Sequence, residues 1–69
     1  MNYKEVEAVE AEFLAQHGAD KNIKFHYHFN QRDTIIIKVT AIIHDDNGKY
    51  FFGYDNGTKH WVSKGFKAN

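Results

Sequence analysis

The sequence predicts an α+β domain in which one N-terminal helix packs on a four-stranded antiparallel β-meander, the order αββββ. Three observations predict this fold. An apolar stripe of helical spacing runs through the first 17 residues, alternation with a period of two begins at Ile23, and two Asp-Asn-Gly triplets separate the later apolar runs. With 69 residues, the chain is expected to form one small domain over residues 1–69.

The helix is predicted over residues 2–17. Asn2 is a typical N-cap residue, and Glu5 three positions later completes a capping box. The stripe that follows recurs at spacings of three or four residues and consists of Tyr3, Val6, Val9 and Phe13. Gly18 is expected to end the helix in a left-handed conformation.

Four strands are predicted after the helix, over residues 23–29, 34–44, 49–54 and 58–64, because apolar and β-branched residues alternate there with polar ones. Each Asn-Gly pair favours a two-residue hairpin loop. Such loops would place Ile43 opposite Phe52, and Phe52 opposite Trp61. A three-residue loop in the first hairpin would place Tyr27 opposite Ile37.

These registers divide the strand residues between two faces of the sheet. One face is expected to form the core under the helix and carries Ile23, Phe25, Tyr27, Phe29, Ile35, Ile37, Val39, Ala41, Ile43, Tyr50, Phe52, Tyr54 and Trp61. The other face has no second helix to cover it. Large apolar side chains on that face, at Ile36, Ile42, Phe51 and Val62, indicate a binding surface.

Protein binding through this second face is therefore the leading functional prediction. Its predicted contact residues are Ile36, Lys38, Ile42, Phe51, Val62, His26, His28 and His60. Because a core of this size supplies only about 3–5 kcal/mol, association with a partner is expected to add stability. We expect an inhibitor or adaptor that docks on a larger protein, of the kind that phages and mobile elements encode, with a homodimer as a further alternative.

The distribution of charge supports a second functional class. Nine basic side chains balance nine acidic ones, yet residues 1–20 hold five acidic groups and one lysine, and residues 21–69 hold eight basic groups and four acidic ones. A weak nucleic-acid-binding module would use the basic sheet face and the C-terminal strip, with phosphate contacts from Lys24, Lys38, Lys59, Lys64 and Lys67. Phe51 and Phe66 would be left to stack on bases.

Catalysis, metals and cofactors are not expected. The chain has no cysteine, a single serine and no glycine-rich phosphate loop, so no nucleophile with its base is apparent. His26 and His28 are spaced as two zinc ligands on one strand face, but the predicted register places no third ligand beside them. No apolar run approaches the roughly 20 residues of a membrane span, and we expect a cytoplasmic protein.

Overall fold

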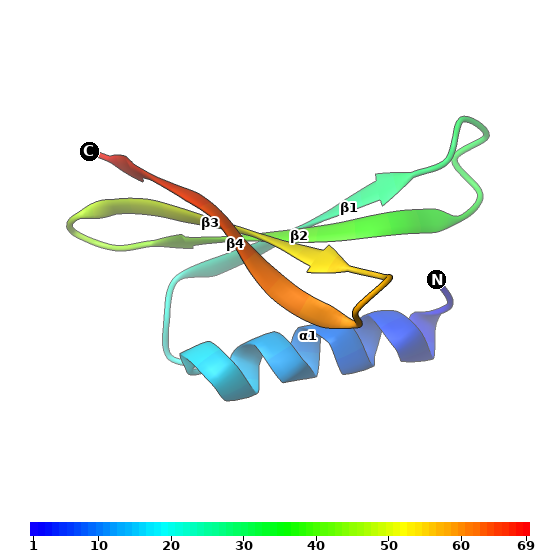
Figure 1. Cartoon of the computed structure of the whole chain (residues 1–69), viewed down its shortest axis with the longest axis horizontal. Coiled ribbons are helices and arrows are strands. Elements are labelled where there is room, and N and C mark those ends of the chain that lie inside the picture. The colour runs from blue at the N-terminus through cyan, green and yellow to red at the C-terminus, as the bar shows by residue number, and fades with distance from the viewer.

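One helix and four strands follow each other in the predicted αββββ order (Figure 1). The computed structural model describes all 69 residues. Helix α1 spans Tyr3–His17, and the strands are β1 (Ile23–Phe29), β2 (Ile36–His44), β3 (Gly48–Asp55) and β4 (His60–Ala68). The strands form one antiparallel sheet in the order β1-β2-β3-β4, which confirms the meander. Helix α1 is not long and apolar enough to cross a membrane.

The ends of α1 follow from local sequence. The Asn2 side chain accepts a hydrogen bond from the Glu5 amide, and the Glu5 carboxylate accepts one from the Asn2 amide, which confirms the capping box. At the other end the Gly18 amide donates to the Leu14 carbonyl. Gly18 has the positive φ expected of a glycine cap, 95°, but its ψ of 129° lies outside the left-handed helical region, so this detail of the prediction is wrong.

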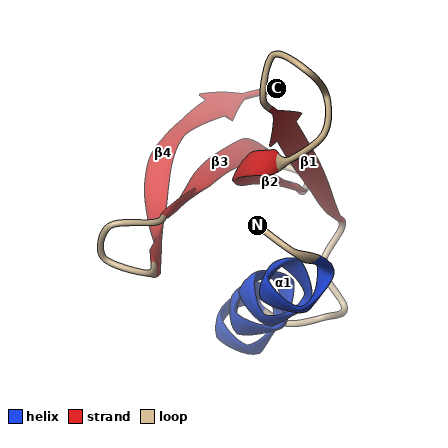
Figure 2. Cartoon of the chain, turned by 90° about the vertical axis from the view of Figure 1, so that its right-hand side faces the viewer, coloured by secondary structure: helices blue, strands red, loops and turns tan.

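The core lies between α1 and one face of the sheet, and the other face has no layer over it (Figure 2). Phe13 is fully buried at its centre, against Ala41 and Ile43 of β2. Its ring contacts the rings of Phe25, Phe52 and Trp61. The Trp61 indole N–H donates to the Val9 carbonyl at 2.8 Å, which ties β4 to the helix. The core is thus small and largely aromatic.

Both later hairpins have loops longer than predicted, so the predicted registers are wrong by two residues. Ile43 lies opposite Tyr50, and Trp61 lies opposite Tyr54. In each turn an aspartate carboxylate accepts two backbone N–H groups that follow it: Asp45 in the first turn, Asp55 in the second. A slip of two residues keeps every side chain on its predicted face.

The first hairpin differs more, because β2 contains a β-bulge. Ile23 pairs with Ile43 and Tyr27 with Val39, but Phe29 pairs with Ile36, so one residue of β2 is extra. Such a bulge exchanges the faces of the residues beyond it. Ile36 therefore lies on the helix side, where it lines a groove with Val6 and Phe29, and not on the open face as predicted.

A second bulge lies in β4, which is longer than predicted. Phe52 pairs with Ser63, whereas Phe51 pairs with Gly65, so Lys64 is the extra residue. Beyond this bulge Phe66 pairs with Tyr50 and its ring lies 4.7 Å from the Tyr50 ring. Residues 65–68, which follow the predicted fourth strand, thus form the end of β4.

Candidate protein-binding surface

The face of the sheet that α1 does not cover carries an apolar centre, hereafter the open-face patch: Ile42, Phe51 and Val62. Ile42 of β2 lies directly opposite Phe51 of β3, and Val62 of β4 pairs with Gly53, two residues along β3 from Phe51. Diagonal neighbours at this spacing are within reach of an aromatic side chain. Val62 is 39% exposed, and Ile42 and Phe51 are half-buried. Three of the four predicted apolar contact residues thus lie together.

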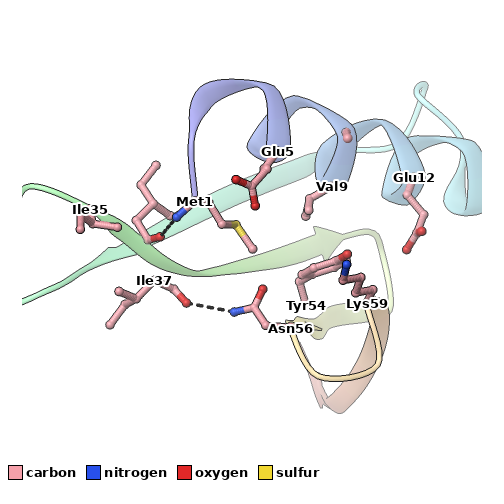
Figure 3. A pocket seen from close by; sticks show the side chains of 11 residues that line it. Met1, Glu5, Val9, Glu12, Ile35, Ile37, Tyr54, Asn56 and Lys59 are labelled. Carbon is pink, nitrogen blue, oxygen red and sulfur yellow. Dashed lines mark hydrogen bonds between the residues drawn. The ribbon is translucent and has the colours of Figure 1, made fainter.

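Ile37 takes the place on this face that the sequence assigned to Ile36. Its side chain is 52% exposed and points away from α1 (Figure 3). The sequence analysis placed Ile37 in the core because strict alternation does not anticipate an extra residue in β2.

Basic side chains surround the open-face patch. Lys24 lies opposite Ile42, and the Lys64 side chain lies over Gly53, with Cε 3.1 Å from the position that a Cβ would occupy there. Lys38 pairs with His28 and is exposed. Four predicted phosphate contacts, Lys24, Lys38, Lys64 and Lys67, are strand residues of this face. Lys59 is different: it lies in the β3–β4 turn and lines a groove on the helix side with Glu5 and Glu12.

Two lysines and a histidine lie together at the end of the sheet near the β2–β3 turn. His44 pairs with Lys49, and Lys49 pairs with Lys67 on its other side. Like charges directly opposite each other in a ladder are unfavourable, and an acidic neighbour would relieve the repulsion. Asp45 and Asp46 of the turn lie at the same end, beside His44, so this end of the sheet carries charges of both signs.

The histidines of the open face have cross-strand neighbours other than the predicted ones. His26 pairs with Thr40 where Lys38 was predicted, and His28 pairs with Lys38 where Ile36 was predicted, so both neighbours differ by two residues. The His28 Nε2 atom lies 3.2 Å from the Thr40 hydroxyl. His60 pairs with Asp55 at the far edge. No three side chains of the types that bind metals come together anywhere in the chain. The imidazoles are available as polar contacts around the patch.

An apolar surface that the sequence did not predict lies at the start of α1, where the helix and the β1–β2 hairpin diverge (Figure 1). Several aromatic and aliphatic residues that were expected in the core or on the helix stripe are exposed here: Tyr3 87%, Tyr27 42%, Phe29 48% and Ile35 51%. Two grooves open at this end, one on each side of Met1, whose amino group donates to the Ile36 carbonyl.

The first groove has a volume of about 590 Å³ and lies between α1, β2 and the β3–β4 turn (Figure 3). Glu5 and Glu12 form its helix wall, and Tyr54 and Lys59 lie across from them. Burial, followed by the charges of Glu12 and Glu5, raises the pKa of Tyr54. The Glu12 Oε2 atom is buried without a hydrogen-bond partner. This groove is acidic on one wall, in contrast to the open face.

The second groove, of about 640 Å³, lies between α1 and β1 and is lined by Tyr3, Val6, Glu10, Tyr27 and Phe29 among others. The Tyr27 hydroxyl donates to the Glu10 carboxylate. That bond, together with burial and the charge of Glu10, raises the pKa of Tyr27 from 10.0 to about 12. The phenol therefore stays protonated and bridges strand and helix.

The chain exposes more surface than a compact monomer of its mass is expected to expose. The chain exposes 5117 Å². A monomer of its mass, 8.1 kDa, is expected to expose about 4,500 Å². Exposed apolar side chains of the β1–β2 hairpin contribute to this excess of about 600 Å².

Comparisons with known proteins supply no relative from which a role could be transferred, since no family model, curated protein or solved structure matches the chain. The open face and the two grooves are therefore the features that bear on function.

Proposed function

We propose that this chain is a non-enzymatic protein-binding domain that docks through its open sheet face on an acidic surface of a larger protein, as an inhibitor or adaptor. The observation that carries the proposal is the open-face patch of Ile42, Phe51 and Val62 within a ring of lysines and histidines. An apolar centre with a polar rim is the usual anatomy of an interface. The proposal includes a phage or mobile-element origin and a cytoplasmic location. A homodimer whose sheet faces cover each other is the alternative to docking on a larger protein.

A nucleic-acid-binding role is the second candidate, and the gathering of lysines on one face favours it. The aromatic residues support it less. The Trp61 indole donates to the helix, and the Phe66 ring, although 51% exposed, pairs with Tyr50 on the helix side, so neither ring lies among the lysines of the open face. Phe51 alone remains, and it is half-buried. The open face therefore fits a protein surface better than a single strand of nucleic acid.

The test is affinity capture from lysate of the native host, with and without nuclease, using the wild type and Phe51→Lys. The proposal predicts a stoichiometric protein partner that survives nuclease and is lost with Phe51→Lys. Ala11→Lys, an exposed change on α1, serves as the matched control and should retain the partner. Val62→Lys provides a second test at a more exposed position, in case Phe51→Lys lowers stability.

Two results would contradict the proposal. Loss of all binding after nuclease treatment would favour the nucleic-acid candidate. Retention of the partner by folded Phe51→Lys and Val62→Lys would show that another surface makes the contact. Sedimentation of the purified chain separates the homodimer alternative, because a self-associating chain would sediment as a dimer without any added partner.

A further inference from the structure

The two edges of the sheet differ in how well they are protected against pairing with another strand. On the outer edge of β4 a bulge interrupts the strand at Ser63–Gly65; Lys64 is its extra residue, and Lys67 follows it. Bulges and lysines are the usual means by which sheets prevent edge pairing. β1 is the other edge, and its seven residues are regular, with no proline, glycine or extra residue. The bulge of the first hairpin belongs to β2.

The direction of the backbone groups on β1 follows from the register. The His44 amide donates to the Asn22 carbonyl, and the Asn30 amide donates to the Ile35 carbonyl. In an antiparallel ladder, hydrogen-bonded and non-hydrogen-bonded residues alternate. Lys24, His26 and His28 therefore direct their N–H and C=O groups toward β2. Ile23, Phe25 and Tyr27 direct theirs outward, where no strand lies (Figure 2).

The two faces beside this edge carry opposite charges. On the helix side lie Glu7 and Glu10, which line the second groove with the exposed rings of Tyr27 and Phe29. On the open side lie Lys24, His26 and His28, all exposed. An added strand would place alternate side chains on these two faces. Its helix-side residues should be apolar or basic, and its open-side residues acidic or polar.

A second copy of this chain does not meet that requirement. Two β1 strands paired antiparallel about a two-fold axis at His26 would place Lys24 opposite His28 of the other copy. The same symmetry would bring the acidic α1 helices of both copies to one side of the extended sheet. The two acidic helices would repel each other, which is unfavourable for self-pairing through β1.

We propose that the outer edge of β1 is a strand-addition site for an extended segment of another protein, whose alternate side chains are apolar or basic on the helix side and acidic on the open side. Main-chain hydrogen bonds to Phe25 and Tyr27 would supply affinity, and Glu7 and Glu10 would select basic side chains. This site shares Lys24, His26 and His28 with the rim of the open-face patch but none of its apolar residues, and it does not depend on the proposed docking there.

The probe is a synthetic nine-residue peptide that alternates Lys and Val with Glu and Thr, and the readout is amide hydrogen exchange followed by NMR. At about 90% saturation the exposed amides of Phe25 and Tyr27 should exchange about tenfold more slowly, because only the unbound fraction exchanges. The exchange rates of the His26 and His28 amides should change little, since carbonyl groups of β2 already accept hydrogen bonds from them. A peptide with N-methyl groups at alternate positions, which cannot donate to β1, should not bind.

A proline variant tests the site from the side of the protein. Tyr27→Pro removes an outward N–H without removing a bond to β2, a substitution that edge strands tolerate, and it should abolish peptide binding. Val62→Lys, in β4 at the far side of the sheet, is the control and should bind as the wild type does. The N-methyl comparison on the wild type still decides the matter if Tyr27→Pro does not fold.

Three outcomes would overturn the proposal. The first two are no peptide binding up to about 5 mM and equal binding of a scrambled peptide. The third is protection of the Phe25 and Tyr27 amides in concentrated protein without peptide, which would indicate self-pairing. Phe51→Lys should bind the peptide normally. Failure at β1 is therefore distinguishable from failure of the open-face docking.

Discussion

Replacement of Phe13 by alanine should remove most of the folded population. Phe13 is fully buried, and its ring lies between 4.4 and 5.7 Å from the rings of His17, Trp61, Phe52 and Phe25. Truncation of a buried phenylalanine to alanine costs about 3–5 kcal/mol. A core in a chain of this size contributes about 3–5 kcal/mol in total. The loss therefore matches the whole stability, and Phe13→Ala should be largely unfolded at 25 °C.

Urea denaturation followed by Trp61 fluorescence and circular dichroism measures this loss, since the indole packs directly on Phe13. Phe13→Leu, which keeps an apolar side chain in the site, should lose about 1–2 kcal/mol and still show a cooperative transition. Tyr3→Ala, at an 87% exposed position, should change stability by less than about 0.5 kcal/mol. A cost below about 1 kcal/mol for Phe13→Ala would refute the aromatic core as the main source of stability.

Three further predictions concern the turns, the titration and the helix cap. Gly48→Ala should lower the free energy of unfolding by about 1–3 kcal/mol in a denaturation experiment. The reason is that φ is 152° at Gly48 and a Cβ there would clash with the Lys67 carbonyl oxygen. Gly65→Ala should cost less, because φ is 138° but a Cβ would meet open space. Tyr27 should titrate near pH 12, so the stabilisation from its hydrogen bond to Glu10 is present below pH 10 and lost as pH rises through 12. Phenolate absorbance measures this titration, and Glu10→Gln should lower the pKa of Tyr27. Asn2→Ala should lower thermal stability by about 0.5–2 kcal/mol and leave the fold intact, and an unchanged melting temperature would contradict the capping box.

The order of elements and most of the two-face assignment could be predicted from the sequence, because alternation fixes the face of a strand residue without fixing its partner. Ile43 was expected opposite Phe52 and lies opposite Tyr50, yet all three residues stay on the helix side. The error arose because the Asn-Gly signal favours a two-residue loop, whereas the carboxylates of Asp45 and Asp55 accept hydrogen bonds that build longer turns.

The bulges could be predicted only in part. Gly65 inside an expected basic strip is the kind of signal that marks a bulge in β4, and it would have placed Phe66 beside Tyr50. The run Ile35-Ile36-Ile37 offers no such signal, since all three side chains suit either face. The exchange of Ile36 for Ile37 on the open face thus depends on the geometry of the first hairpin.

Exposure at the start of α1 could not be predicted, because period and spacing do not show how far a helix covers a sheet. The 15 residues of α1 extend about 22 Å at 1.5 Å per residue, whereas the molecule is 36 Å long. The helix also diverges from the β1–β2 hairpin (Figure 1). Tyr27 and Phe29 therefore alternate as core residues do and still remain half-exposed.

Photocrosslinking from position 51 tests the proposed docking face most directly. A photoreactive phenylalanine in place of Phe51 keeps the aromatic ring in the open-face patch, and the same residue in place of Ala11 reports on the exposed side of α1. In lysate of the native host treated with nuclease, position 51 should form an adduct with one protein of larger mass, and position 11 should not. Equal adducts from both positions, or adducts from position 11 alone, would contradict docking through the open sheet face.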